Sequence, residues 1–252
     1  MAKKEDFFIQ ENEILFVPDE DYAPMERYIQ FLDAFSRTTY VSIYVIDYFR
    51  KNFLYVSENP LFLCGMPAGK VRDMGYDFYL ERVTDADLPL LLEINRAGFL
   101  FSESVPPVNR LEYTLGYDFH MKQPSGKAML VHHEITPLHL TRDGRIWLAL
   151  CSVSLSSQTK AGNIEISRQG CNSRWRYHPE NKKWVKYAGV ELKDYEKEVL
   201  RLSAQGCTMN EISEQIHKSV DTIKGYKRLL FEKLNVGNIT EALGFAIHHR
   251  LI

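Results

Sequence analysis

Residues 208–234 read TMNEISEQIHKSVDTIKGYKRLLFEKL, and this stretch decides the fold of the carboxyl-terminal part of the chain. Thr208 and Glu211 have the spacing of a capping box, in which each side chain bonds a free backbone N–H of the other residue. Ser219 is a second capping residue. The stretch therefore predicts a short helix, a tight turn and a longer helix over 220–234.

The predicted helix over 220–234 has two different faces. Apolar side chains spaced by three and four residues form its inward face, namely Ile223, Tyr226, Leu230 and Leu234. The opposite face carries an exposed cationic stripe made of Lys224, Lys227, Arg228 and Phe231. A short helix, a tight turn and a basic-faced helix are the helix-turn-helix arrangement, whose second helix fits a DNA major groove roughly 12 Å wide. On its own, the stripe is more typical of a solvated helix face, where most surface lysines lie.

Helix signals continue on both sides of this motif. Residues 194–203 are amphipathic and end before Gly206, and Asn238 with Glu241 repeats the capping-box spacing at the start of a last helix. Residues 191–252 are therefore predicted to form four short helices. In such a domain, lysine contacts to phosphates supply affinity and contacts to base edges supply sequence choice.

This tail resembles the LuxR-type (GerE-like) DNA-binding domain. The matching residues are Glu196, Glu198, Val199, Leu200, Gly206, Glu211, Ile212, Ser213, Ser219, Thr222, Ile223, Lys224, Lys233, Leu234, Asn235, Val236, Asn238, Glu241 and Ala242. The resemblance implies that DNA faces Thr222, Lys224, Gly225 and Arg228, and the helical stripe adds Lys227. It also implies a dimer contact on the last helix, through Ala242, Leu243, Ala246 and Ile247.

Some residues depart from the family pattern. Tyr195 and Ile239 stand where the family usually has Arg, Tyr226 replaces the usual His, and Lys193 replaces the usual capping Thr. These changes leave ion pairing within the domain open, and operator preferences of the family do not transfer. Gly225 costs ~1 kcal/mol against alanine inside a helix. It is either a tolerated weak position or a place where the backbone approaches DNA closely.

The first part of the chain is predicted to be an antiparallel sheet with helices. Apolar residues at positions 25, 28, 29, 32 and 35 predict the inward face of a helix, residues 58–86 are expected to be irregular, and a second helix is expected over Leu88–Leu100. The five predicted strands are Val41–Tyr48, Phe53–Val56, Leu111–Lys122, Ala128–Leu140 and Ile146–Ser154.

Residues 25–158 resemble the PAS sensor fold in this order of elements, and residues 83–87 (VTDAD) resemble a corner motif common in such domains. The resemblance implies a sensor that takes a small organic ligand or acts by protein contact. Flavin-binding relatives need a cysteine in a specific motif, and the surroundings of Cys64 do not match it. Haem-binding relatives often supply a histidine from the central helix, and Leu88–Leu100 has none. We therefore expect no cofactor.

Residues 159–190 are predicted to be a basic linker. Residues 161–190 contain six Lys and Arg against two Asp and Glu, whereas residues 1–160 have 16 against 22. Aromatic pairs on either side of residues 178–183 predict a β-hairpin. A docked hairpin is the favoured interpretation. Contact with nucleic acid is the alternative, through Arg174, Arg176, Lys182, Lys183 and Lys186.

The composition excludes several classes of protein. The 252 residues are 45% hydrophobic and 25% charged, with a net charge of −2, which is typical of globular domains. No apolar run approaches the ~18 residues of a membrane helix. Four cysteines lie far apart, which indicates reduced thiols in the cytoplasm. His132 and His133 are neighbours on a strand and point to opposite faces, so no metal site is expected. No catalytic motif is present, and we expect no enzyme.

The sequence thus predicts an α+β chain with a five-stranded antiparallel PAS-like sheet and an all-α four-helix helix-turn-helix domain. The expected parts are an extension over 1–24, a sensor domain over 25–158, a linker over 159–190 and a DNA-binding domain over 191–252. The expected function is a cytoplasmic, homodimeric transcription regulator that binds double-stranded DNA and senses an unknown ligand or partner, without membrane attachment. The alternatives are a PAS-based adaptor whose tail dimerises without binding DNA, and an enzyme with an appended regulator domain.

Overall fold

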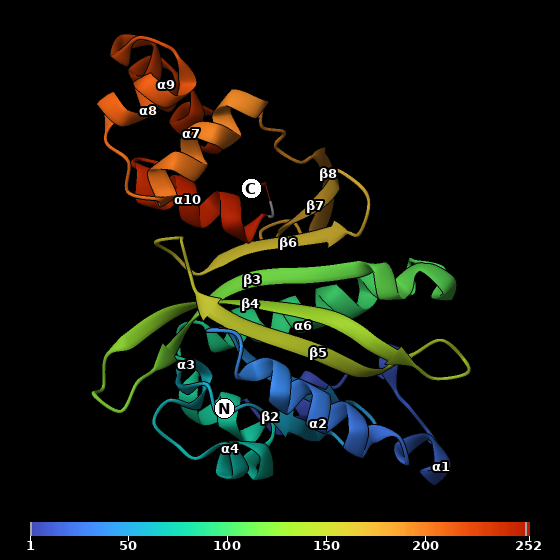
Figure 1. Cartoon of the computed structure of the whole chain (residues 1–252). Coiled ribbons are helices and arrows are strands. Elements are labelled where there is room, and N and C mark those ends of the chain that lie inside the picture. The colour runs from blue at the N-terminus through green and yellow to red at the C-terminus, as the bar shows by residue number, and fades with distance from the viewer. Residues whose placement is uncertain (1, 250) are drawn as a thin grey trace. The chain divides into compact units, whose positions relative to one another are not determined.

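An antiparallel sheet is the framework of the amino-terminal part of the chain in the computed structural model, which describes residues 2–249, 251 and 252 (Figure 1). Its strand order is β2-β1-β5-β4-β3-β6-β7-β8. The strands are β1 (Ser42–Asp47), β2 (Asn52–Val56), β3 (Tyr113–Lys122), β4 (Ala128–Leu140), β5 (Ile146–Leu155), β6 (Gly162–Arg168), β7 (Ser173–His178) and β8 (Lys183–Ala188). The chain divides into two units, Met1–Tyr187 and Ala188–Ile252.

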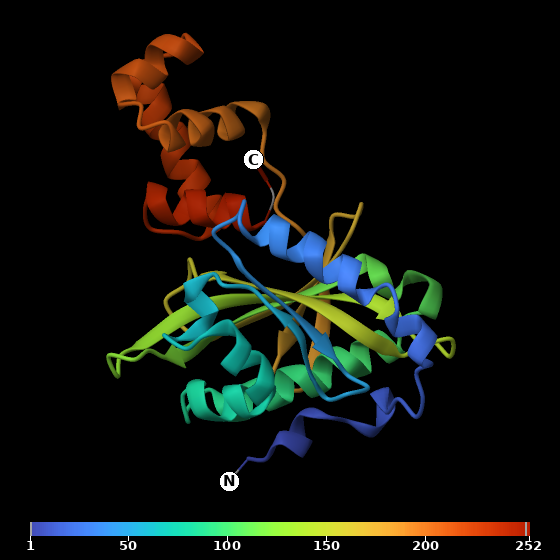
Figure 2. The ribbon, with the colours of Figure 1, turned by 60° about the horizontal axis from the view of Figure 1, so that its bottom comes forward.

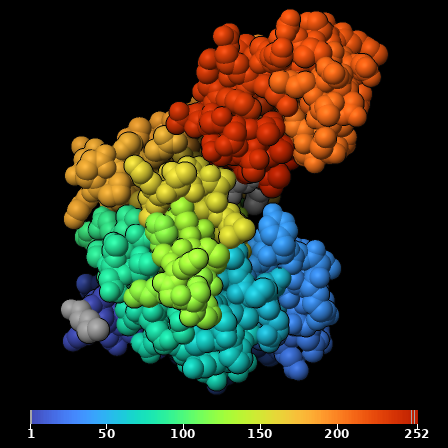
Figure 3. All heavy atoms as spheres, turned by 90° about the vertical axis from the view of Figure 1, so that its left-hand side faces the viewer, coloured from blue at the N-terminus to red at the C-terminus, as the bar shows by residue number. Residues whose placement is uncertain are grey.

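Strands β1 to β5 confirm the predicted PAS-like sheet, but the prediction of five strands falls short by β6, β7 and β8. Strand β6 pairs with the edge of β3, where Leu115 faces Ile166. Ile164 and Ile166 are 2% and 3% exposed, so the alternation in this strand has a buried side. The segment predicted to be a linker therefore extends the sheet, and its surface is continuous with that of the earlier strands in Figure 3.

Helices cover both faces of the sheet (Figures 1 and 2). Helix α2 (Met25–Ser36) lies on one face, where Met25, Ile29 and Leu32 pack with residues of β1. Helix α6 (Leu88–Glu103) lies on the other face. The predicted inward face of α2 needs a correction, because Tyr28 and Phe35 are 44% and 49% exposed. The apolar residues of α2 extend around more of the helix than the sheet covers, so some of them remain exposed.

Residues 58–86, expected to be irregular, contain three short helices. They are α3 (Pro60–Leu63), α4 (Ala68–Met74) and α5 (Asp77–Arg82). Positive φ angles of 48° at Cys64 and 55° at Gly75 separate them. Each helix is too short to show a helical period in the sequence. Four further short helices lie in this unit, namely η1 (Lys4–Phe7), η2 (Gln10–Asn12), α1 (Asp19–Tyr22) and η3 (Pro107–Glu112).

The described residues of the second unit form four helices, as predicted: α7 (Asp194–Ala204), α8 (Met209–Ile216), α9 (Val220–Leu234) and α10 (Ile239–His248). The predicted capping box is present, because Thr208 N donates to Glu211 Oε2 at 2.7 Å and Glu211 N donates to Thr208 Oγ1 at 3.4 Å. Ser219 Oγ accepts from the Thr222 N–H at 3.2 Å and caps α9. His217, in a left-handed conformation with φ 55°, ends α8. These local signals set the turn between α8 and α9.

Candidate nucleic-acid interface and sensor cavity

Helix α9 is fixed in the second unit by its apolar face. Ile223, Leu230 and Leu234 are at most 3% exposed. Ile223 packs with residues of α7 and α8, whereas Leu230 and Leu234 pack with residues of α7 and α10. The inward face predicted from the sequence is therefore observed. The orientation of the outer face follows from this anchoring.

The outer face of α9 presents two exposed cations. The side chains of Lys224 and Arg228 are 60% and 77% exposed. Lys224 Nζ lies 3.0 Å from an oxygen of Asp221, and Arg228 Nε lies 3.9 Å from an oxygen of Glu232. Exposed ion pairs of this kind contribute little to stability. Both cations therefore remain available to an anionic partner.

The other stripe residues are placed less simply. The Thr222 hydroxyl lies 2.8 Å from the Ser219 hydroxyl, at the first turn of α9. Lys227 is half-buried, and this burial lowers the pKa of its ammonium group. A Cβ at Gly225 would meet no atom within 4 Å, so packing does not require glycine there. Phe231, predicted in the stripe, packs instead against the core shared with α10.

Two departures from the family pattern contact each other. The rings of Tyr195 and Tyr226 lie 4.3 Å apart between centroids and join α7 to α9. Nearby, Glu196 is 4% exposed and accepts from Lys233 Nζ and from Lys193 N, each at 2.7 Å. The sequence left ion pairing within this domain open, and the structure shows an ion pair between Glu196 and Lys233. Position 195, where the family usually has Arg, makes an aromatic contact instead.

The predicted dimer contact on α10 needs a correction. Ala242 and Ala246 are 0% exposed because they pack in the core of their own unit, so their side chains cannot reach a second copy. Leu243 is half-buried, and Ile247 is 54% exposed. The sequence does not show which apolar residues of α10 face the core of their own unit and which face solvent. The packing of α10 in the structure separates the two groups.

A cavity of about 60 Å³ lies inside the first unit, between α6 and the sheet. Apolar side chains form most of its wall, including Phe99, Leu115 and Ile166, and Tyr48 and Tyr117 add hydroxyl-bearing rings. The wall of this cavity suits a small, largely apolar molecule.

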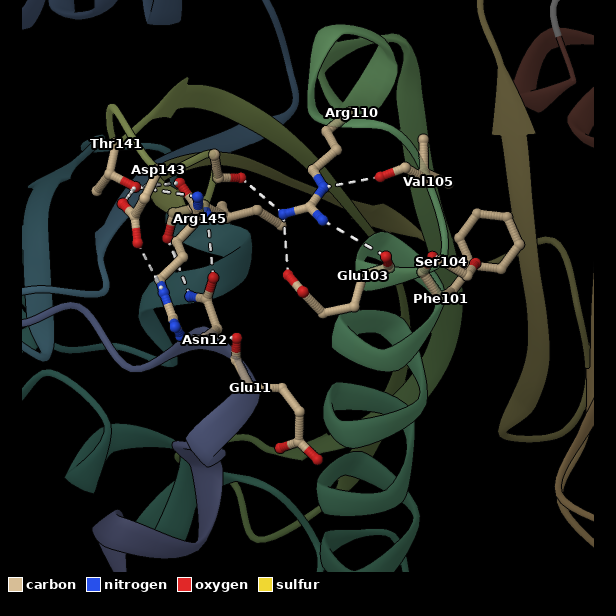
Figure 4. Close-up of polar contacts among 12 residues, drawn as sticks. Glu11, Asn12, Phe101, Glu103, Ser104, Val105, Arg110, Thr141, Asp143 and Arg145 are labelled. Atoms are coloured by element: carbon tan, nitrogen blue, oxygen red, sulfur yellow. Dashed lines mark hydrogen bonds and ion pairs between the residues drawn. The ribbon is translucent and has the colours of Figure 1, made fainter.

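Arg110 is the charged residue in the wall of this cavity, and it is 6% exposed. Its Nη1 donates to Glu103 Oε1 at 2.9 Å and to the Gly144 carbonyl at 2.7 Å, while its Nε donates to the Val105 carbonyl at 3.0 Å (Figure 4). One carboxylate therefore balances the guanidinium charge, and backbone carbonyls satisfy other N–H groups. A neutral ligand suits this wall better than a carboxylate, which would compete with Glu103.

A buried polar network lies deeper in the same unit. The Tyr44 hydroxyl hydrogen-bonds both the Tyr79 hydroxyl and His133 Nε2. Among the described residues, His133 Nδ1 has no hydrogen-bond partner. Burial lowers the pKa of His133 to about 3, so the imidazole is neutral near pH 7. Sequence reasoning missed this network because the three residues come from separate elements.

The described residues contain no group of three or more His, Cys, Asp or Glu side chains placed to hold a metal ion. The cysteines Cys64, Cys151, Cys171 and Cys207 are all free thiols. Within residues 2–249, 251 and 252, no helix has the length and apolar character to cross a bilayer.

Comparison with known proteins identifies the second unit. Residues 191–246 match the sequence profile of the family "Bacterial regulatory proteins, luxR family" (GerE). This is a family of regulatory proteins and not of enzymes, and the match gives no support to a tail that only dimerises. No curated protein matches the chain significantly.

Solved structures resemble the chain at low identity. A Vibrio cholerae VqmA dimer without target DNA is 15% identical, with a TM-score of 0.35 and 88% of each chain covered. A Vibrio cholerae VqmA complex with ligand and DNA is 16% identical, with a TM-score of 0.36 and 87% of each chain covered. A PAS domain from Colwellia psychrerythraea is 11% identical, with a TM-score of 0.38, and covers 52% of this chain and 96% of that one. Likeness at this level bears on neither the ligand nor the DNA site of this chain.

Proposed function

We propose that this chain, whose residues 191–246 form a luxR-family domain, is a transcription regulator that binds double-stranded DNA through α9 and is modulated through its PAS-like unit. The observation that carries the proposal is the exposed pair of Lys224 and Arg228 on a helix anchored by a buried apolar face. A regulator of this kind works in the cytoplasm, where bacterial DNA lies.

The outer face of α9 supplies both kinds of DNA contact. The Lys224 ammonium is a mobile point charge suited to a phosphate, and the Arg228 guanidinium can bind a phosphate or a guanine edge with two N–H groups. Thr222 precedes Lys224 in the first turn of α9, and Gly225 lies between the two cations. Lys227, half-buried, contributes charge from the side of the helix.

The regulator acts as a homodimer. In the second unit the contact uses Leu243 and the exposed Ile247 of α10. Two bound copies place their recognition helices at half-sites about 34 Å apart, one turn of the duplex.

Helix α2 supplies a further contact between the two copies. Its outer side exposes Tyr28, Phe31 and Phe35 by 44%, 67% and 49%, and uncovered aromatic stripes of this kind mark protein contacts.

The cavity beside Arg110 holds the sensed ligand, a small neutral molecule with a largely apolar body. A ligand can shift the regulator between states only by binding one state better than the other. The cavity lies against β3 and β6, through Tyr117 and Ile166, and β6 begins the segment that leads to the second unit. A ligand in the cavity therefore stabilises one arrangement of β3 and β6 over another, and β6 precedes the DNA-binding helices in the chain.

Selection of bound fragments from genomic DNA tests this function. We expect the full-length chain to enrich one pseudo-palindromic sequence whose half-sites lie about 34 Å apart. Protein that has been unfolded and refolded, and so stripped of small molecules, should bind the same sequence with a changed affinity. Failure to enrich any sequence would contradict DNA reading, and identical affinities of both preparations would contradict modulation by a co-purified ligand.

A matched pair of variants separates dimerisation from folding in this experiment. Ile247→Glu places a charge on the exposed side of α10 and should reduce the enrichment of paired half-sites. Gln205→Glu adds the same charge at an exposed position at the end of α7, outside α10, and should leave the enrichment unchanged.

A further inference from the structure

The hairpin formed by β7 and β8, residues 173–188, carries positive charge that the function proposed above leaves unused. We call it the basic hairpin. It contains five Lys and Arg residues and one acidic residue. Such a concentration of one sign of charge attracts an anionic partner.

One side of the basic hairpin is fixed to α6. Trp184 Nε1 donates to the Ala97 carbonyl at 3.3 Å, and the Tyr177 hydroxyl donates to Glu93 Oε1 at 2.5 Å. The ring of Phe101, also on α6, lies 5.3 Å from that of Trp184. The hairpin is therefore a rigid part of the sheet and not a flexible arm, so its charges need little ordering when a partner binds.

Three lysines of the basic hairpin remain exposed and without an acidic partner. Lys182 lies in the turn, and Lys183 and Lys186 lie on opposite faces of the edge strand β8, where Lys186 Nζ is 5.3 Å from the centroid of the Trp175 ring. Within the described part of the chain, none of the three forms an ion pair with a carboxylate. The nearby acids are engaged elsewhere, because Glu165 binds Arg176 at 2.6 Å and Glu180 binds His178 at 3.1 Å.

A short connection joins the basic hairpin to the second unit. Strand β8 ends at Ala188 and α7 begins at Asp194. At roughly 3.3–3.6 Å per residue, this connection spans at most about 20 Å whatever arrangement the two units adopt. One turn of duplex DNA is about 34 Å long. One turn of DNA bound by the second unit is therefore longer than the connection between the two units, so the duplex is long enough to reach the hairpin as well.

We propose that the basic hairpin is a second DNA-contacting surface, which binds phosphates of the duplex beside the site read by α9. This inference rests on the proposed function. Lysine ammonium groups neutralise phosphates and release counterions without reading base edges. The hairpin therefore adds affinity and salt dependence to DNA binding and leaves sequence preference to α9.

The test compares full-length variants by DNA affinity over a range of salt concentrations. Lys182→Gln, Lys183→Gln and Lys186→Gln are combined in one variant. Each lost phosphate contact lowers the slope of log affinity against log salt by about 0.9, so the slope should fall by up to about 2.7. Affinity for specific and random duplexes should fall by a similar factor, about 10-fold or more at low salt, with their ratio preserved.

The matched control removes the same charge from other exposed positions, Lys51, Lys70 and Lys127, each replaced by Gln. This control should keep the slope of the unchanged chain to within one phosphate contact. If the triple variant unfolds, the double variant Lys182→Gln/Lys183→Gln, at the turn end of the hairpin, replaces it. Its slope of log affinity against log salt should also fall, but by less.

Three results would overturn part of this account. A hairpin variant with the slope of the unchanged chain, or with the slope of the control, overturns the inference and leaves the proposed function standing. A change in the ratio of specific to random binding overturns the assignment to phosphates. Absence of salt-sensitive DNA binding by the unchanged chain overturns the proposed function, and the inference with it.

Discussion

Replacement of both Lys224 and Arg228 by alanine is expected to weaken DNA binding by about 100-fold or more at physiological salt. Each cation supplies a contact worth ~1–3 kcal/mol, and 1.4 kcal/mol is a tenfold change in affinity. Both side chains are exposed, so the helix anchoring stays intact. Fluorescence anisotropy with a labelled genomic fragment measures the affinity, and a thermal melt verifies the fold.

The matched control for this variant is Lys127→Ala with Arg142→Ala, which removes two exposed cations from turns of the first unit. The control should bind DNA within a few-fold of the unchanged chain, because the effect of distant surface charge is screened by salt. Equal affinities of the α9 variant and the unchanged chain would show that DNA lies elsewhere on the molecule.

Acidification is expected to destabilise the first unit through His133. Its folded-state pKa is about 3, against an ordinary value of 6.5. Below pH 6.5 the unfolded chain therefore binds a proton that the folded chain does not, so the free energy of unfolding falls as the pH falls. The expected slope is about 1.4 kcal/mol per pH unit, or about 2 kcal/mol between pH 6.5 and 5.0.

Urea unfolding at pH 7.5 and at pH 5.0 measures this effect, and His133→Gln is the variant that isolates it. Glutamine stays neutral and can accept from the Tyr44 hydroxyl, so the variant should lose about 2 kcal/mol less on acidification than the unchanged chain. Tyr44 and Tyr117 contact the imidazole and Tyr79 contacts Tyr44, and burial raises the pKa of each of these tyrosines. They remain neutral in this range. Equal losses in both proteins would contradict a neutral, buried His133.

Local signals explain why the second unit was predicted in detail. Thr208, Ser219 and Asn238 each cap a helix through contacts within four residues, so the sequence contains the information that sets the helix starts. The apolar period of α9 likewise identified its buried face. The same reasoning failed at Phe231 and at Ala242, because the position of α10 decides which residues of α9 and α10 are covered.

Long-range pairing explains why the first unit was predicted less completely. Strands β1 to β5 are rich in β-branched and aromatic residues or alternate in polarity, and their ends agree with the predicted ranges to within about two residues. Strand β6 lies in a basic segment, and its place is set by the free edge of β3. The network of Tyr44, Tyr79 and His133 joins residues up to 89 positions apart, and no spacing in the sequence indicates it.

Photo-cross-linking from single positions of the full-length chain tests most directly whether α9 lies on DNA. A cross-linking residue is placed at Arg228, 77% exposed on α9, and separately at Arg142, 85% exposed in the turn between β4 and β5. The account predicts cross-links from position 228 to bases inside the enriched half-site and none from position 142. Cross-links from 142 and not from 228, or no cross-link from 228 while the protein is bound, would contradict it.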